Sequence, residues 1–289
     1  MLLHGGPLLP DDSAASSVAP VIAYLLLGDP LSDSDRAALF TRARGLLPVL
    51  TECGPWDGLR DIVFSARRYA LNATTPPTVR NAALSLVSAL GERDAADRLV
   101  RSAHHLGQIP PELATLLQTA GAQALWSIAW QLKSEPQSAS APSLASLAHG
   151  LGADAWHRAL MESSSHSAEE ALSILPLIAG LPTVAARLTA RRLSEYPDAR
   201  VRQRALAFLF SLVPYDPVTL EMVKSALRDA DAVVADIARA AVLRLEPTDM
   251  ALIDLALDEA VASPAQGMLK QQLEDRRRTP ASVADLPVT

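Results

Sequence analysis

The sequence predicts an all-α protein built from repeated helix pairs. Hydrophobic residues form 49% of the 289 positions, but aromatic residues form only 4%. A core of short aliphatic side chains favours closely packed helices over an aromatic-rich sheet. Apolar residues recur at helical spacing along nearly the whole chain, with no convincing run of alternating β-branched residues. The second half also contains a pattern that recurs after 33 residues, which is typical of repeat architectures.

Eight helices are expected in the first half of the chain. Ser, Asp or Pro stands near their starts, and Gly or Pro stands near their ends. Connections of mostly two to six residues predict that neighbouring helices are antiparallel. The expected helices span 15–28, 33–52, 56–72, 77–91, 93–106, 111–119, 121–133 and 143–150.

Eight further helices are expected in the second half. The serine run 163–165 precedes Ala168-Glu169-Glu170 and indicates a helix N-terminus with acids in its first turn. That interpretation is preferred to a nucleophile, because neighbours in sequence seldom form a catalytic triad. The expected helices span 153–163, 167–179, 182–195, 199–212, 217–228, 231–245, 248–261 and 264–277.

The ends of the chain and one internal segment lack this helical pattern. Residues 1–13 and 279–289 are expected to be frayed or disordered. The Ser- and Pro-rich segment 134–143 has the composition of a flexible surface loop and is a candidate hinge. The domain organisation is therefore one helical-repeat domain over 14–278, with that hinge inside it.

Residues typical of metal, cofactor or nucleophile chemistry do not form recognisable motifs. Cys53 is the single cysteine, which excludes an internal disulfide and a CxxC zinc site. The six histidines lack metal-ligand spacing, and neither Gly5-Gly6-Pro7 nor Gly150-Leu151-Gly152 resembles a phosphate-binding loop. We therefore expect no metal, no cofactor and no enzymatic activity.

The first apolar stretch predicts a buried helix rather than an export or membrane signal. Residues 18–27 are too few to span a bilayer, and they include Pro20. No Lys or Arg precedes Arg36, so the positive start of a signal peptide is missing. We expect a cytoplasmic protein with no membrane partner. Arginine outnumbers lysine by 23 to 3, a bias common in GC-rich bacterial genomes.

The repeated pattern places three apolar residues at i, i+4 and i+8, on one stripe of one helix. The preceding helix repeats as well, since Leu220 and Val223 align with Ile253 and Ala256 after the same 33 residues. The repeating unit is therefore a helix pair whose central alanine allows close helix approach. The copies of the stripe are Val201/Ala205/Leu209, Val234/Ala238/Val242 and, earlier in the chain, Val79/Ala83/Val87.

This pattern resembles the HEAT-repeat family. The segment 227–234 reproduces the turn of that family, with two aspartates, Asp229 and Asp231, before a valine that opens the second helix. A Val-Arg pair of the same kind occurs at Val201-Arg202. The resemblance covers about 182–262 and 76–90 and weakens over 92–180. Position 235 is alanine where the family usually has a basic residue, so a continuous charge ladder is interrupted there.

The resemblance implies a right-handed α-solenoid of about seven antiparallel helix pairs. One pair cannot bury its apolar face alone, so stacked pairs share a continuous core. The second helices of the pairs would line a concave face, a surface that binds other macromolecules. Arg202 occupies the ladder position of the family, and we expect it to reach Asp229, which begins the corresponding turn one repeat later.

The charges of the second half are segregated along the chain. The segment 187–204 contains six arginines and two acids, whereas the segment 229–259 contains eight acids and two arginines. We expect a protein-binding scaffold or adaptor that docks its partner on the concave face, with arginines contacting partner carboxylates. The candidate contact residues are Arg187, Arg191, Arg192, Arg200 and Arg204.

Nucleic-acid binding or DNA repair on the same fold is the main alternative. HEAT-like alkylpurine DNA glycosylases use tryptophans and an aspartate in a basic groove, and Trp126, Trp130, Trp156 and Asp154 are the residues available here. A core position is favoured for the tryptophans, and the net charge of −6 disfavours a polyanion. An enzyme related to the bilin lyases, which carry similar repeats, is a third alternative, although no pigment pocket can be identified.

Overall fold

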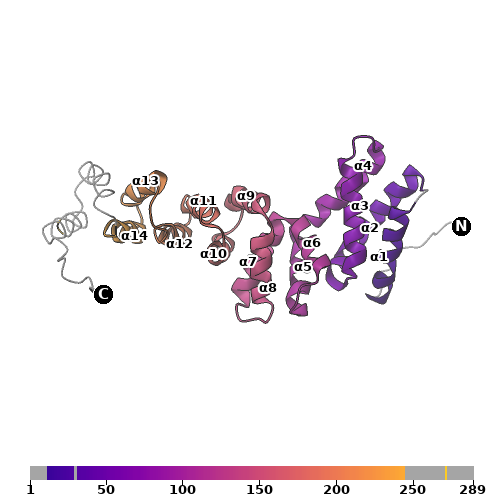
Figure 1. Cartoon of the computed structure of the whole chain (residues 1–289), viewed down its shortest axis with the longest axis horizontal. Helices are drawn as coiled ribbons and strands as arrows, with labels where there is room; N and C mark the ends of the chain where they lie inside the picture. Colours follow the sequence, from indigo (N-terminus) through magenta and orange to yellow (C-terminus); the bar gives the residue numbers. More distant parts are fainter. Residues whose placement is uncertain (1–11, 29–30, 245–270, 272–289) are drawn as a thin grey trace, which may run out of the picture. The chain divides into compact units, whose positions relative to one another are not determined.

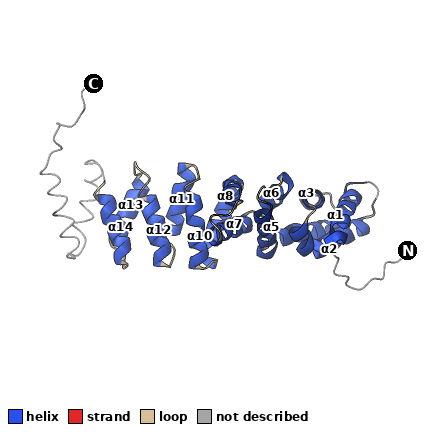
Figure 2. Ribbon diagram, turned by 90° about the horizontal axis from the view of Figure 1, so that it is seen from below, coloured by secondary structure: helices blue, strands red, loops and turns tan. Residues whose placement is uncertain are grey.

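The computed structural model describes residues 12–28, 31–244 and 271. Within them the chain forms fourteen α-helices and one 3₁₀ turn, and no strand (Figures 1 and 2). The all-α prediction is confirmed. The expected helices agree with the observed ones to within three residues at each end. The last two expected helices, 248–261 and 264–277, lie outside the described residues except for Gln271.

The chain divides into two compact units, residues 1–181 and 182–289. In the first unit α2 packs against α1, α4 and α5, and α7 packs against α5, α8, α9 and α10. The helices of this unit are α1 (Asp12–Leu27), α2 (Asp33–Cys53), α3 (Trp56–Leu71), α4 (Pro77–Leu90), α5 (Arg93–Leu106), α6 (Pro111–Ala120), α7 (Ala122–Ser134), α8 (Ala141–Gly150), α9 (Ala153–Glu162) and α10 (Ala168–Ile178).

The described part of the second unit, residues 182–244, forms two helix pairs in two layers. Helix α11 packs on α12, and α13 packs on α14. The second helices, α12 and α14, also pack against each other, while α11 and α13 lie side by side in the other layer (Figures 1 and 2). The helices are α11 (Thr183–Ser194), α12 (Ala199–Leu209), α13 (Pro217–Ala226) and α14 (Ala232–Val242).

Side-chain caps fix where several helices begin. Ser167 accepts a hydrogen bond from the Glu170 amide, and the Glu170 carboxylate accepts one from the Ser167 amide, which forms a capping box on α10. The preceding serines, 163–165, form the 3₁₀ turn that leads into this cap. The run therefore lies at a helix start, as expected. Aspartates cap the last three helices that the structure describes: Asp198 on α12, Asp216 on α13 and Asp231 on α14.

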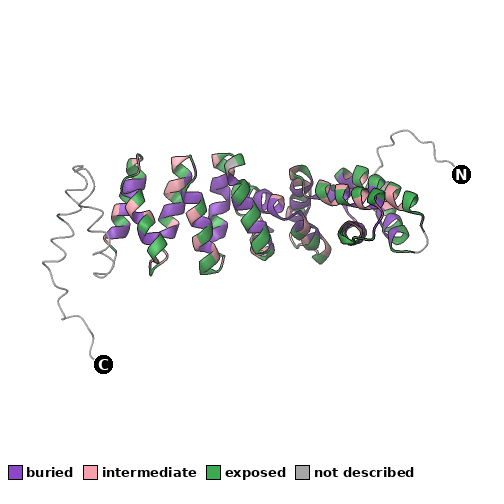
Figure 3. Ribbon diagram, turned by 90° about the horizontal axis from the view of Figure 1, so that it is seen from above, coloured by how far each residue is buried: buried purple, intermediate pink, exposed green. Residues whose placement is uncertain are grey.

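The repeated stripe is the centre of the core in the second unit. Buried residues lie where neighbouring helices meet, and exposed residues cover the outward faces (Figure 3). The expectation that both late copies of the stripe are buried is confirmed. Val201, Ala205, Leu209, Val234, Ala238 and Val242 are all 0% exposed. The earlier copy is only partly similar, because Val79 and Ala83 are buried whereas Val87 is half-buried.

The tryptophans of α7 do not share one environment. Trp126 is 1% exposed and stacks on the His166 ring, with 4.1 Å between ring centroids. Trp130, one turn later, is 42% exposed, and the Lys133 ammonium lies 5.1 Å from the centre of its ring. The core position expected for Trp130 is therefore wrong, whereas that for Trp126 is confirmed. Trp156 is also buried, and its indole nitrogen donates to the Ala148 carbonyl at 3.0 Å.

The division between the units falls at Leu181/Pro182. The candidate hinge 134–143 lies inside the first unit, where it joins α7 to α8. Among the described helices, none has the length and the apolar character that crossing a bilayer requires.

Candidate functional site

The five candidate arginines lie on the two consecutive helices α11 and α12. Arg187 and Arg191 are four residues apart and therefore share one face of α11, while Arg192 lies beside that face. Arg200 and Arg204 are likewise four apart on α12. Their side chains differ in what they contact, and this difference decides which of them a partner can reach.

Arg187 and Arg191 converge on a single carboxylate, that of Asp216. The Arg187 Nη1 atom lies 3.0 Å from Asp216 Oδ2, and Arg191 Nη2 contacts both oxygens of the same group. Arg187 also donates to the Leu212 carbonyl at 3.0 Å, and Arg191 donates to the Thr219 hydroxyl at 3.0 Å. The two guanidinium groups thus tie α11 to the start of α13. We call these four side chains, Arg187, Arg191, Asp216 and Thr219, the Asp216 cluster.

Asp216 is also the N-cap of α13. Its Oδ1 atom accepts a hydrogen bond from the Thr219 amide at 2.8 Å, so the carboxylate stabilises the positive end of the helix dipole. Burial acts to raise the pKa of Asp216. The Thr219 amide, the two guanidinium groups and the Thr219 hydroxyl outweigh burial and lower that pKa to about 2. The Asp216 carboxylate is therefore ionised at neutral pH, where it is the counter-ion of both arginines.

The other three candidate arginines are exposed. Arg192 contacts Glu195, the residue that follows α11, at 2.9 Å, and Arg200 contacts the cap residue Asp198 at 3.1 Å. Exposed pairs of this kind contribute little to stability, so a partner can replace them at small cost. Arg204 makes no ion pair with any described residue. The structure thus separates an exposed group, Arg192, Arg200 and Arg204, from the Asp216 cluster.

Arg202 contacts Asp229 across the repeat boundary. Its Nε and Nη2 atoms lie 3.2 and 3.1 Å from the two oxygens of Asp229, in a bidentate arrangement. The remaining Nη1 donates to the carbonyls of Tyr196 and Pro197 at 3.2 and 2.7 Å. These contacts join the turn before α12 to the turn before α14. The side chains are only 21% and 19% exposed, so a partner has little access to them.

A second tie connects the same two turns. The Gln203 amide donates to Asp231 at 3.0 Å, and Asp231 also accepts from the amides of Val233 and Val234 at the start of α14. The Val234 amide, followed by Gln203, lowers the pKa of Asp231. Both aspartates of the repeat turn therefore act within the fold, one as an ion-pair partner and one as a helix cap.

Helices α12 and α14 both carry exposed side chains that a partner can reach. These side chains include Arg200 and Arg204 on α12, and Val233 and Asp236 on α14. Val233 is 51% exposed, and Asp236 pairs with Arg239 one turn later. We call these four residues the α12–α14 surface. It combines positive, negative and apolar side chains on neighbouring helices.

Sequence reasoning missed Asp216 as the residue that organises the arginines. It lies 25 and 29 positions after Arg191 and Arg187, outside the charged window of 187–204. A sequence signal was present, because Asp216 precedes Pro217 at an expected helix start and so has the position of an N-cap. Its second role depends on the packing of α13 beside α11, which the charge count does not contain.

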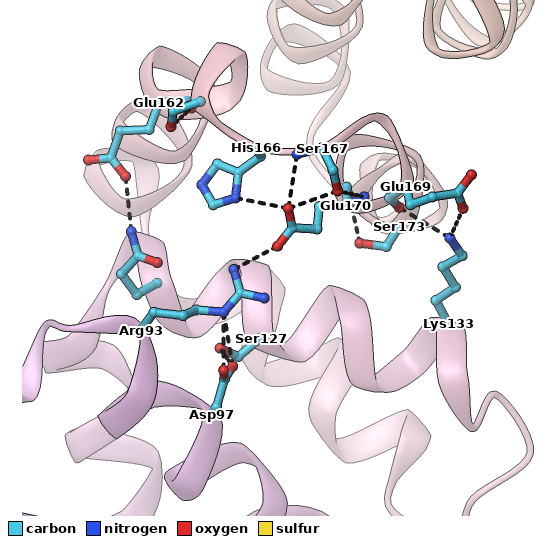
Figure 4. A network of polar contacts seen from close by, with 12 residues as sticks. Arg93, Asp97, Ser127, Lys133, Glu162, His166, Ser167, Glu169, Glu170 and Ser173 are labelled. Carbon is cyan, nitrogen blue, oxygen red and sulfur yellow. Dashed lines mark hydrogen bonds and ion pairs between the residues drawn. The ribbon is translucent and has the colours of Figure 1, made fainter. Parts of the chain in front are cut away.

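A separate polar network lies in the first unit and joins α5, α7 and α10 (Figure 4). Arg93 pairs with Asp97 on its own helix and with Glu170 at 3.0 Å, and Ser127 contacts Asp97. Burial acts to raise the pKa of Glu170, but the amide and hydroxyl of Ser167, then Arg93 and His166, lower it. Each charged group faces a partner from another helix, so the network holds these helices together.

The residues of the repair alternative do not form a base-binding site. Trp126 and Trp156 are packed in the core of the first unit, so neither can stack on a flipped base. Trp130 and Asp154 are exposed, on α7 and α9. The described residues contain no group of three or more His, Cys, Asp or Glu that could hold a metal ion.

No protein-family model matches the chain, and searches of the curated proteins and of the solved structures return no match.

Proposed function

We propose that the protein is a non-enzymatic scaffold or adaptor that binds another protein on a HEAT-like surface. In this proposal the chain is a right-handed α-solenoid of about seven antiparallel helix pairs, and the second helices line its concave face. The 33-residue offset and the two-layered pairs of the second unit support this arrangement. For a chain of this composition, the bacterial cytoplasm is the proposed location.

The ion pairs that the candidate arginines form favour a protein over a nucleic acid as the partner. Four of the five candidate arginines already contact an acid of their own unit, and two of those four share the Asp216 carboxylate. A nucleic-acid surface gains its affinity from cations that neutralise phosphates, and paired arginines supply little of that effect. A protein interface is served by mixed charges around apolar contacts, as on the α12–α14 surface.

Nucleic-acid binding remains the second candidate function, and one observation favours it. Arg192, Arg200 and Arg204 expose their guanidinium groups on consecutive helices, where they could contact successive phosphates. The acids that pair with Arg192 and Arg200, and Asp236 on the neighbouring helix, oppose a polyanion at the same place.

Affinity capture with a reversed surface charge tests the proposed function. We expect the full chain to retain at least one protein from a nuclease-treated lysate, and we expect the double variant Arg204→Glu/Val233→Asp to lose it. Both side chains are exposed, so the variant should keep the helical content of the wild type. Arg42→Glu, which reverses an exposed arginine on α2, is the matched control and should retain the partner. Equal capture by the double variant, or capture of no protein by the wild type, would contradict the proposal.

A further inference from the structure

A second arginine-rich site lies in the first unit, apart from the α12–α14 surface. The end of α2, the start of α3 and one face of α5 line an open pocket of about 430 Å³. Helix α5 supplies Arg98, Arg101 and His105 at spacings of three and four residues, so all three can point to one side. A pocket of this volume accommodates a whole small molecule.

The arginines of the pocket have hydrogen-bond donors to spare. The Arg98 Nε atom donates to the Thr51 hydroxyl at 3.0 Å, which leaves its two Nη groups without an acceptor among the described residues. Arg101 is exposed and contacts no described acid. Arg187 and Arg191 differ from these two arginines, because both form ion pairs with Asp216. Two guanidinium groups in one pocket therefore face a site that can accept an anion.

Contacts between α5 and the end of α2 fix the side of the pocket that α5 forms. The Ser102 hydroxyl donates to the Glu52 carbonyl at 2.9 Å, at the end of α2 where backbone carbonyls lack helical partners. Thr51 is fully buried and donates in turn to the Leu47 carbonyl at 2.6 Å. The position of Arg98 is thus fixed by a buried hydroxyl, so its Nη groups are oriented before a ligand arrives.

The other walls of the pocket favour a flat apolar group beside the anion. Trp56 supplies an aromatic face, and Leu106, which is 51% exposed, supplies an aliphatic one. Glu52 is the single acid in the lining and can accept a hydrogen bond from an N–H or O–H of a ligand. The lining therefore carries two arginines against one carboxylate, beside an indole ring.

We propose that this pocket binds a small molecule in which an oxyanion is joined to a planar aromatic ring. The oxyanion contacts the guanidinium groups of Arg98 and Arg101 and the imidazole of His105, and the ring packs between Trp56 and Leu106. Guanidinium groups pair with phosphate and carboxylate in a bidentate manner, and aromatic rings stack on indole. This site does not depend on the scaffold function.

Titration with phenyl phosphate tests the proposal, and the indole N–H signal of Trp56 in a two-dimensional NMR spectrum is the readout. The variant Trp56→Phe identifies that signal among the four tryptophans of the chain. We expect a saturable shift with a dissociation constant below about 1 mM. Inorganic phosphate lacks the ring and phenol lacks the charge, so each should bind at least about tenfold more weakly. Added salt should weaken the binding of phenyl phosphate.

Arginine variants assign the binding to this pocket. Arg98→Gln/Arg101→Gln should weaken phenyl phosphate about tenfold or more, and Arg101→Gln alone about fivefold. Arg101 is exposed, so the single variant tests the proposal even if the double variant is unstable. Arg42→Gln removes one arginine charge from α2, outside the pocket lining, and this variant should bind phenyl phosphate as the wild type does. The proposal is overturned if Trp56 shows no saturable shift up to about 10 mM, if phosphate binds as tightly as phenyl phosphate, or if Arg101→Gln has no effect.

Discussion

Replacing Asp216 with alanine should destabilise the second unit by about 2–3 kcal/mol. The substitution removes the N-cap of α13 and also the shared partner of Arg187 and Arg191, whose side chains are only 16% and 19% exposed. Two partly buried guanidinium groups would then lack their counter-ion, which costs more than the loss of a surface pair.

Hydrogen exchange in α11 and α13 is the measurement for this prediction, because all four tryptophans lie in the first unit and their fluorescence would not report on the second. Asp236→Ala is the matched control: it removes an exposed acid from α14 and should change stability by less than about 0.5 kcal/mol. Similar exchange in the two variants would show that the Asp216 cluster contributes little.

The charge of Asp216 also predicts how stability depends on pH. Its pKa is lowered from an ordinary value of 3.8 to about 2, so its contribution is complete above about pH 4 and is lost as the pH falls towards 2. The carboxylate is 34% exposed, and after solvent screening we expect a loss of about 1 kcal/mol. Asp216→Asn keeps a capping side chain without the charge, so this part of the pH dependence should disappear in that variant.

Enlarging Ala238 to leucine should destabilise the second unit by about 1–3 kcal/mol. Ala238 is 0% exposed and belongs to the cluster in which α12, α13 and α14 meet. Extra methylene groups at a close helix contact force side chains away from their preferred rotamers or push the helices apart. Far-UV circular dichroism during urea unfolding, together with hydrogen exchange in α14, would measure the change.

Ala240→Leu is the matched control for Ala238→Leu. It makes the same change two residues later on the same helix, where the side chain is exposed. We expect it to alter stability by less than about 0.5 kcal/mol. If both leucine variants were equally stable, the 33-residue alignment would place the wrong stripe of α14 in the core.

The helices could be predicted from the sequence because their signals are local. Asp198 precedes one expected helix and Asp231 begins another, and both residues are N-caps in the structure. The stripe at i, i+4 and i+8 is buried in both late copies. Caps and periodicity act within a few residues, so they can be read without knowing the tertiary packing.

The ion-pair partners of the arginines could not be predicted in the same way. The partner of Arg187 and Arg191 is the N-cap of α13, a helix that is next in space but two helices later in the chain. Counting charges between 187 and 204 therefore suggested one basic segment, whereas packing divides it into the Asp216 cluster and an exposed group. Charge patterning describes a surface only after the partners in the fold are known.

The tryptophans of α7 illustrate a second limit of the pattern. A residue four positions later lies about 40° around the helix and about 6 Å along it. Trp126 meets His166 in the core, whereas Trp130 lies near the end of the helix beside Lys133 and remains 42% exposed. Helical spacing predicts a shared face, but the extent of the neighbouring helices decides how much of that face is covered.

An anisotropy titration with random duplex and single-stranded DNA tests the central claim, that the arginine-rich segment serves the fold and a protein partner rather than nucleic acid. At about 0.15 M salt we expect no submicromolar binding of either DNA by the full chain. Submicromolar affinity with a salt slope of about −0.9 per phosphate contacted, lost in Arg191→Ala/Arg200→Ala, would contradict the claim and assign the segment to nucleic acid.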